Sequence, residues 1–285
     1  MNDARFLPIN SPPPTGLFCF VSDGYTGFSP DLFMKDTVVQ IDSDASTYVD
    51  SPADLDTTSV GLSVMHDFSK VDMETINMVL DNMLQYLSMD DGIVQVYFDK
   101  ERPRVDPVVV ANVLYLFHLA GRHHEIESSA TFIHQVLLHR AYENGTIFYA
   151  LPECFLFHVS RIVHRFPDQF ADNGIRDLLQ HRLRQHISNL VGDLPNNNLA
   201  MSLAMSIVAC YFCGLDGAEH DLVQRKVLCR MLELQREDGS WNCDPYYRYG
   251  SNVVSWIGNE GVTTAFALLA MNLHSGSNNR NAKLA

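Results

Sequence analysis

The chain has 285 residues, 46% of them hydrophobic, which is enough for one large domain or two small ones with a substantial core. Its net charge of -14 and its isoelectric point near 5.1 argue against a nucleic-acid-binding protein, because no basic stripe is present to offset phosphate charge. No apolar stretch reaches about 18 uncharged residues, so no membrane-spanning helix is expected.

Residues 1–49 differ in pattern from the rest of the chain, and we expect them to form an N-terminal strap or linker. The segment Ile9–Gly16 contains a proline run typical of a linker. The segment Val38–Asp44 superficially resembles a hydrolase nucleophile after a strand, but the surrounding sequence is too short for such a fold. No apolar leader is visible at the N-terminus, so the sequence favours a cytoplasmic protein with reduced cysteines.

Two carboxylates, Asp54 and Asp56, lie two residues apart and are followed by the hydroxyls of Thr57 and Thr58 and then by an apolar helical run. Carboxyl groups held close together and sheltered from water do not both ionise easily, so one pKa rises and that group keeps its proton. A neutral carboxylic acid beside an apolar cavity is suited to protonating an alkene. The alternative is that Asp54 or Asp56 only caps the helix.

A loop signature of Asp or Asn before Gly recurs along the chain. The glycines at 92, 145, 192 and 239 are separated by 53, 47 and 47 residues, and apolar helical runs follow them. These runs are 106–117, 153–166, 198–212 and 261–273, and the run after Asp56 makes a fifth. The segments 181–190 and 221–237 are amphipathic and more charged. Repetition of a helix pair at this period predicts an all-α solenoid or closed toroid with inner and outer helices.

Few other elements are predicted. Ile93–Phe98 is the best candidate for a strand, and residues 276–285 are expected to be a disordered tail. The pair Cys210 and Cys213 lies in an apolar run without two further well-spaced ligands, so packed thiols are expected rather than a zinc site. The histidines show no metal-ligand spacing.

The segment Gln235–Trp241 resembles the Gln-Trp repeat motif, Q-x-x-D-G-S-W, of the terpene cyclase and protein prenyltransferase toroids. Asp54–Thr58 resembles the D-x-D-T-T acid motif of class II terpene cyclases. With the period of about 47 residues, the resemblance covers residues 50–275 and implies an α/α toroid, a double ring of about five helix pairs. Tyr97–Pro107 is similar to the drimane-type sesquiterpene cyclases, whose haloacid dehalogenase-like phosphatase domain has no counterpart in this chain.

The resemblance implies that Asp56 is the general acid that protonates an alkene or epoxide of a linear isoprenoid. It also implies a substrate such as farnesyl diphosphate, which would give a drimane-type bicyclic product. Asp54, Thr57 and Thr58 are expected to tune it. Aromatic faces are expected to stabilise the carbocation, and a cationic loop to hold a diphosphate. The substrate-binding candidates are Tyr97, Phe98, Phe148, Tyr149, Tyr246, Tyr247, Trp256, Lys100, Arg102 and Arg104.

Trp241 itself is expected to be structural. Arg102 and Arg104 have a simpler alternative, which is pairing with the nearby Asp99, Glu101 or Asp106. Protonation needs no cofactor and no protein-bound metal is expected; Mg²⁺ is expected only if the substrate carries a diphosphate. A separate phosphatase is the one protein partner considered.

Three other functions remain open from the sequence. The first alternative is a cyclase or isomerase of a neutral prenylated metabolite. The second is a non-catalytic toroid that binds a prenyl group or a partner protein. The third is a protein prenyltransferase β-like subunit. The last lacks a convincing Asp/Cys/His zinc set.

Overall fold

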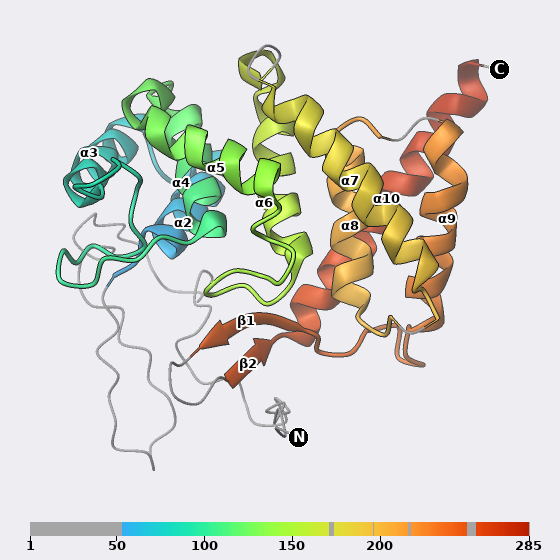
Figure 1. The fold of residues 1–285 in the computed structure, drawn as a ribbon. Helices are drawn as coiled ribbons and strands as arrows, with labels where there is room; N and C mark the ends of the chain where they lie inside the picture. The colour runs from blue at the N-terminus through green and yellow to red at the C-terminus, as the bar shows by residue number, and fades with distance from the viewer. Residues whose placement is uncertain (1–52, 171–173, 196, 216–217, 250–254, 285) are drawn as a thin grey trace. The chain divides into compact units, whose positions relative to one another are not determined.

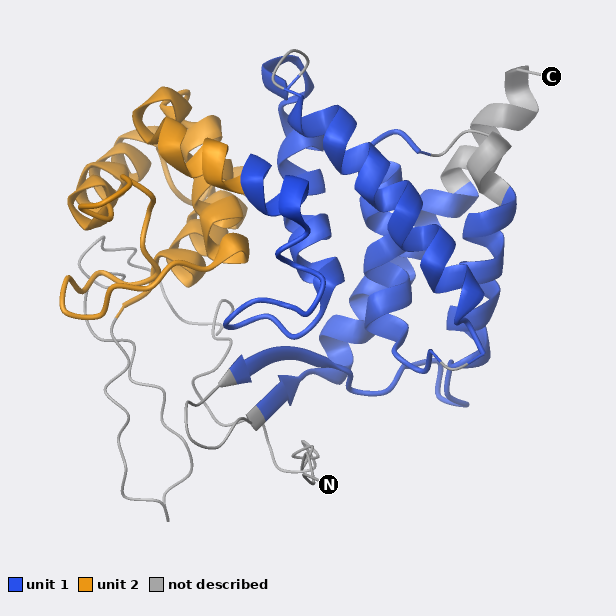
Figure 2. Cartoon of the chain, viewed as in Figure 1, with its two compact units in different colours: residues 1–7, 134–285 blue, residues 8–133 orange. Residues whose placement is uncertain are grey.

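The structure is a computed structural model that describes residues 53–170, 174–195, 197–215, 218–249 and 255–284 (Figure 1). The expected N-terminal strap, including Val38–Asp44, lies outside these residues. Two compact units are present, and the boundary between them falls within one helix (Figure 2). Unit 2 contains the described residues up to Ile133, and unit 1 contains those from His134 onward.

Unit 2 is built on helix α2, Leu55–Asp67, which packs against α4, Pro107–Leu119. Helix α4 begins where it does because Asp106 caps it: its Oδ1 accepts the Val108 N–H at 2.8 Å, and Pro107 occupies the first turn. All residues from Val108 to His118 are buried. The remaining helices are α3 (Met73–Met83), the short η1 (Leu84–Tyr86) and η2 (His123–Ile126), and α5 (Glu127–His139).

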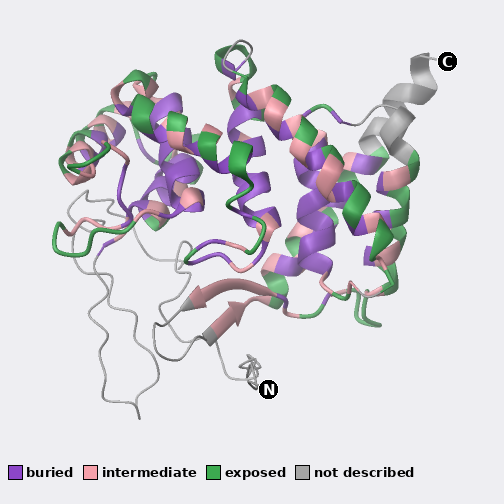
Figure 3. Ribbon diagram, in the orientation of Figure 1, coloured by how far each residue is buried: buried purple, intermediate pink, exposed green. Residues whose placement is uncertain are grey.

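Unit 1 is organised around α8, Ala200–Phe212, which packs against α6, α9 and α10. Helix α8 is buried on all sides from Ala200 to Cys210, as Figure 3 shows by colour. Its neighbours are α6 (Pro152–Arg165), η3 (Pro167–Phe170), α7 (Ile175–Gly192), α9 (Ala218–Glu233) and α10 (Glu260–Leu284). Strands β1 (Pro245–Tyr249) and β2 (Ser255–Gly258) form an antiparallel pair between α9 and α10.

Helices occupy all five predicted apolar runs, and α7 and α9 occupy the two amphipathic segments. Burial follows the same division: α4 and α8 are buried nearly all round, whereas α7 buries one stripe that contains Leu179 and Leu183. Three of the four repeat glycines, including Gly145 and Gly239, have positive φ. Gly192 differs, because it is the last residue of α7.

Three details differ from the sequence-based expectations. Ile93–Phe98 forms isolated bridges, Val94 with Leu87 and Tyr97 with Asp54, because each partner segment is too short to extend a ladder. The pair β1–β2 was not predicted. Helix α10 continues to Leu284, through the expected disordered tail at 276–285, because a formed helix gains a backbone hydrogen bond for each residue that it adds.

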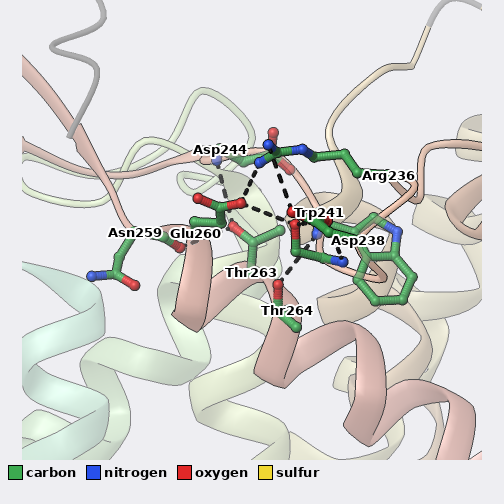
Figure 4. A network of polar contacts seen from close by, with 9 residues as sticks. Arg236, Asp238, Trp241, Asp244, Asn259, Glu260, Thr263 and Thr264 are labelled. Carbon is green, nitrogen blue, oxygen red and sulfur yellow. Dashed lines mark hydrogen bonds and ion pairs between the residues drawn. The ribbon is translucent and has the colours of Figure 1, made fainter. Parts of the chain in front are cut away.

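The segment that follows α9 forms a polar network around a buried tryptophan (Figure 4). Trp241 is fully buried; its Nε1 donates to the Met231 carbonyl at 2.7 Å, and its backbone N–H donates to Thr264 Oγ1 at 3.2 Å. Arg236 pairs with Glu260 at the start of α10. These contacts tie the end of α9 to the beginning of α10, so Trp241 has the structural role expected of it.

The described cysteines are free, and Cys210 and Cys213 are both buried. Burial raises the pKa of the Cys210 thiol to about 12, so it is a packed thiol and not a reactive one. Within the described residues, no helix combines the length and the apolar character needed to cross a bilayer.

Candidate functional site

The acid segment is fixed at the start of α2 by backbone pairing with the loop that precedes α4. Leu55 N–H donates to the Val96 carbonyl at 2.8 Å, and Phe98 N–H donates to the Ala53 carbonyl at 3.0 Å. An antiparallel bridge joins Asp54 to Tyr97. The first residues of α2 are therefore held by hydrogen bonds on both sides of Asp54, before any side chain contributes.

Asp54 is the N-cap of α2. Its Oδ1 accepts the Thr57 N–H at 2.6 Å, which satisfies one of the free N–H groups of the first turn. Burial raises the pKa of the Asp54 carboxyl above its ordinary value of 3.8, although hydrogen bonds from Thr57 and Asp56 act in the opposite direction. The capping alternative therefore applies to Asp54. Thr58 donates its hydroxyl to the Asp54 backbone carbonyl at 2.7 Å, not to a carboxylate.

Asp56 has a different environment. It lies in the first turn of α2, is half-buried, and its Oδ1 accepts a hydrogen bond from the Asn112 side-chain amide at 2.7 Å. Asn112 is 2% exposed and belongs to α4, where every other residue from Val108 to Phe117 is apolar. A buried amide in such a helix needs a polar partner, and Asp56 is that partner.

This hydrogen bond restricts where a proton can reside on Asp56. An amide N–H only donates, so Oδ1 is the acceptor; because the carbonyl oxygen of a neutral carboxyl is the better acceptor, this bond favours the hydrogen of a neutral Asp56 on Oδ2. After Oδ2 loses the proton, the same amide stabilises the carboxylate through a charge-assisted hydrogen bond. The first-turn N–H groups and the helix dipole also favour negative charge at this position. Asp56 is thus equipped to act as an acid whose anion is stabilised.

The loop after Tyr97 and Phe98 brings basic side chains near the acid segment within unit 2. Phe98 packs edge-on against Tyr86 at 5.4 Å between ring centroids, and Lys100 Nζ lies 5.9 Å from the Tyr86 ring. Arg102 forms an ion pair with Asp99 at 3.2 Å, as in the alternative in which this arginine pairs with a nearby carboxylate. Lys100 and Arg104 are exposed. The cations are therefore present at the surface of this loop, and Arg102 is already partly neutralised.

Four predicted aromatic residues meet in unit 1 and are called the aromatic cluster here: Phe148, Tyr149, Tyr246 and Tyr247. Phe148 stacks on Tyr247 at 5.8 Å, and Tyr149 meets Tyr246 and Tyr247 edge-on at 5.3 and 5.7 Å. A bridge between Tyr149 and Tyr247 fixes the arrangement. Stacked and edge-on contacts of this kind are the arrangements that aromatic rings prefer, so the aromatic cluster is a packed unit.

Trp256 does not join the aromatic cluster. It lies on β2 opposite Arg248 of β1, whose guanidinium is 6.0 Å from the Trp256 ring centroid. A tryptophan face that already carries a protein cation is poorly placed to stabilise a second one. The structure thus separates Trp256 from the other aromatic candidates.

No group of three or more His, Cys, Asp or Glu side chains among the described residues could hold a metal ion. Within the basic loop, the Asp99 carboxylate already accepts from the Glu101 N–H at 2.9 Å and pairs with Arg102.

Asn112 is the residue at this site that the sequence analysis missed. A single amide inside an apolar helical run was the available signal, since such a group must find a partner when buried.

Comparison with known proteins gives a consistent result. Residues 34–120 match the C-terminal domain of astC-like sesquiterpene cyclases. The chain is 36% identical over 220 residues to the drimenol cyclase drtB of Aspergillus calidoustus, a match that covers 77% of this chain but 38% of that protein. The chain therefore spans well under half the length of this curated relative.

A solved structure, that of the type II terpene cyclase MstE from Scytonema without ligand, matches with a TM-score of 0.57 at 15% identity. The match covers 87% of this chain and 79% of that one, and it confirms the expected fold class, an all-α chain of the α/α toroid type. In sequence and in fold, the chain resembles the class II terpene cyclases of the drimane type.

Proposed function

We propose that this chain is a class II-type terpenoid cyclase that protonates the terminal alkene of a linear isoprenoid, with Asp56 as the general acid. The observation that carries the proposal is the 2.7 Å hydrogen bond from Asn112 to Asp56, made by a buried amide in an otherwise apolar helix. The similarity to a drimenol cyclase supports farnesyl diphosphate as the substrate and a drimane-type bicycle as the product.

Protonation of an alkene demands a strong acid, because an alkene is a very weak base. The acid must be neutral before the step and its anion must be stabilised after it. Asn112 meets the second demand, because it donates to Oδ1 both before and after Oδ2 gives up its proton. Asp54 serves Asp56 indirectly, because it caps the turn that carries Asp56. Thr57 and Thr58 act through Asp54, to which both are hydrogen-bonded.

The cyclisation then proceeds through carbocations, which need stabilisation without nucleophilic attack. In unit 2, which carries Asp56, Tyr97 and Phe98 are the candidates for this role, and an aromatic ring contributes roughly 0.5–2 kcal/mol. The residues of the aromatic cluster belong to unit 1 and are candidates by residue type. A diphosphate would bind the exposed side chains of Lys100 and Arg104, with Arg102 joining if it leaves Asp99.

The described residues contain no group of three or more His, Cys, Asp or Glu side chains that could hold a metal ion, and no step is assigned to one. A magnesium ion bound to the substrate diphosphate would neutralise part of its charge and would keep several of its waters. A separate phosphatase is proposed as the partner that releases the alcohol from a diphosphate product.

The test is incubation of the purified chain with farnesyl and geranylgeranyl diphosphate, followed by phosphatase treatment and gas chromatography with mass spectrometry. Asp56→Asn is expected to abolish product formation. Asp54→Asn is the matched control, because asparagine can still cap α2, and it is expected to retain measurable turnover. Turnover that survives Asp56→Asn refutes the acid assignment. Tight prenyl binding by the parent chain without turnover favours a non-catalytic binding protein.

A further inference from the structure

Helix α2 carries three buried hydroxyl side chains in the two turns that follow Asp56, and they differ in their hydrogen bonding. Thr58 and Ser63 each donate to the carbonyl four residues earlier, at 2.7 and 2.6 Å, which is a common arrangement for a hydroxyl inside a helix. Ser59 is fully buried, and its Oγ has no hydrogen-bond partner among the described residues. A buried hydroxyl without a partner costs stability, so such a group calls for a functional explanation.

Ser59 lies three residues after Asp56 in the same helix. Residues at this spacing are neighbours on the helix surface, with Cβ atoms about 5–6 Å apart. Every Cα–Cβ bond of a helix tilts toward the N-terminus, so the Ser59 side chain leans toward the turn that carries Asp56. A serine hydroxyl and an aspartate carboxyl that extend toward each other span such a distance. The proximity of the two side chains is therefore fixed by α2 itself.

Three other side chains of unit 2 have a buried polar atom without a hydrogen-bond partner among the described residues, namely His66, Gln95 and His123. The Gln95 atom is Oε1, which only accepts and cannot stabilise a carboxylate. His66 lies in the last turn of α2, and His123 lies in η2, beyond the end of α4. Of this set, Ser59 alone can donate a hydrogen bond within one turn of Asp56.

We infer that Ser59 is a positioning residue for the acid, whose hydroxyl donates to the Asp56 carboxylate as the proton leaves; the inference rests on the proposed function. In that step the O–H bond of Asp56 breaks, and its hydrogen forms a C–H bond with the electron pair of the alkene. Negative charge develops on the carboxyl, and the Ser59 hydroxyl turns toward it while keeping its own proton. A carboxylate has about four lone-pair sites, so it can accept from Asn112 and Ser59 together.

The two donors then act at different stages of the reaction. Asn112 is bound to Asp56 before the proton moves. Ser59 has no partner at that stage and gains one only as the charge develops. An interaction that is made in the transition state but not in the ground state raises kcat and leaves KM unchanged.

The test compares Ser59→Ala with the parent chain in turnover of farnesyl diphosphate and in urea denaturation. We expect kcat to fall on the order of 10-fold with KM unchanged, because a hydrogen bond to a developing charge is lost. The free energy of unfolding should not fall, because the hydroxyl has no partner in the folded chain. Ser63→Ala is the matched control: it makes the same change one turn later, at a hydroxyl that already donates to the Ser59 carbonyl, and should keep the parent kcat.

The pH profile of kcat/KM gives a readout that a packing role would not move. The acid must be protonated, so activity falls as the pH rises through the titration of Asp56. Without the Ser59 donor the carboxylate is less stable, so this fall should occur at higher pH in Ser59→Ala than in the parent. The other titratable groups of α2, α4 and their N-caps are the same in both proteins: Asp54, His66, Asp67, Asp106, Tyr115 and His118.

Several results overturn the inference and leave the proposed function intact. They are a parent kcat in Ser59→Ala, equal losses of kcat in Ser59→Ala and Ser63→Ala, and a pH profile that does not shift. A loss of unfolding free energy together with kcat in Ser59→Ala also overturns it, because Ser59 is then a packing residue. If the parent chain consumes no isoprenoid, or if Asp56→Asn stays active, the proposed function fails as well.

Discussion

At the scale of single residues, the two aspartates of the acid segment have separate tasks. Asp54 caps the N-terminus of α2, where it accepts a backbone N–H of the first turn. Asp56 instead accepts a hydrogen bond from a side chain of another helix. Asp54 is thus engaged within its own turn, whereas Asp56 is joined to a buried amide of α4. The residue that distinguishes them is Asn112.

Asn112→Ala is therefore expected to lower kcat about 10- to 100-fold with little change in KM, because the lost hydrogen bond to a charged group is worth roughly 1.5–3 kcal/mol in the step that forms the carboxylate. Single-turnover kinetics with farnesyl diphosphate measures the effect. Val113→Ala, at the next buried position of α4, is the control for packing loss. An equal loss of kcat in both variants would assign Asn112 a packing role only.

A second residue-scale prediction concerns Asp244, which is 4% exposed and whose Oδ2 accepts the Met201 N–H at 2.8 Å in the first turn of α8. Burial raises its pKa from 3.8 to about 6. A raised folded-state pKa gives stability that is fully present below 3.8 and is lost as the pH rises through 6.

The parent chain should therefore lose up to about 3 kcal/mol of unfolding free energy relative to Asp244→Asn between pH 4 and pH 8. Asparagine keeps an oxygen that can cap α8, so the comparison isolates the charge. Urea denaturation at several pH values measures this, and parallel pH profiles for the two proteins would contradict it.

At the scale of elements, the turn before α6 positions the aromatic pair Phe148 and Tyr149. Thr146 N–H donates to the Tyr149 carbonyl at 2.8 Å, and Gly145 has φ of +74°. A methyl carbon added at Gly145 would lie 2.6 Å from the carbonyl oxygens of Tyr149 and Ala150. This turn requires glycine for two reasons, its positive φ and its close backbone contact.

Gly121 separates these two reasons, because it has φ of +72° but no atom within 4 Å of an added methyl. Gly121→Ala should lower the unfolding free energy by about 1–2 kcal/mol, which is the cost of placing an alanine at positive φ without any steric clash. Gly145→Ala should lower it by roughly 1–3 kcal/mol more, because the neighbouring backbone must move. Equal losses in chemical denaturation would show that the turn adapts without strain.

The elements also show what the sequence could and could not predict. Helices α4 and α8 were predictable because their apolar runs are long and follow a regular period. The β1–β2 pair was not, because its bonds depend on distant segments, such as Arg248 N–H donating to the Phe148 carbonyl at 2.8 Å. The bond between Asp56 and Asn112 joins residues 56 positions apart, and no local pattern encodes such a contact.

The motif residues show a similar limit. The sequence placed Thr57 and Thr58 correctly in the first turn of α2, but it did not identify the Asp54 backbone carbonyl as the acceptor of the Thr58 hydroxyl. It also grouped Trp256 with the tyrosines, although the Arg248 guanidinium lies over the Trp256 ring. Residue types could be predicted from a pattern, whereas their partners required the fold.

At the scale of the whole molecule, the acid and the basic loop belong to unit 2, and the aromatic cluster belongs to unit 1. The match to a drimenol cyclase covers 38% of that protein, so the chemistry of the larger protein need not all take place here.

The chain of 285 residues is accordingly expected to convert farnesyl diphosphate to a bicycle that keeps its diphosphate. Phosphorus NMR of the reaction should show an intact diphosphate, and added alkaline phosphatase should release the alcohol. Release of inorganic phosphate or diphosphate by the purified chain alone would contradict this expectation.

The most direct test of the central claim, that Asp56 starts the reaction by protonation, is turnover in deuterium oxide. Asp56 exchanges with solvent, so mass spectrometry of the cyclised product should show about one deuterium per molecule, on the ring carbon derived from the terminal alkene CH. Asp56→Asn should give no cyclised product. A cyclised product without deuterium, or deuterated product from Asp56→Asn, would contradict the account.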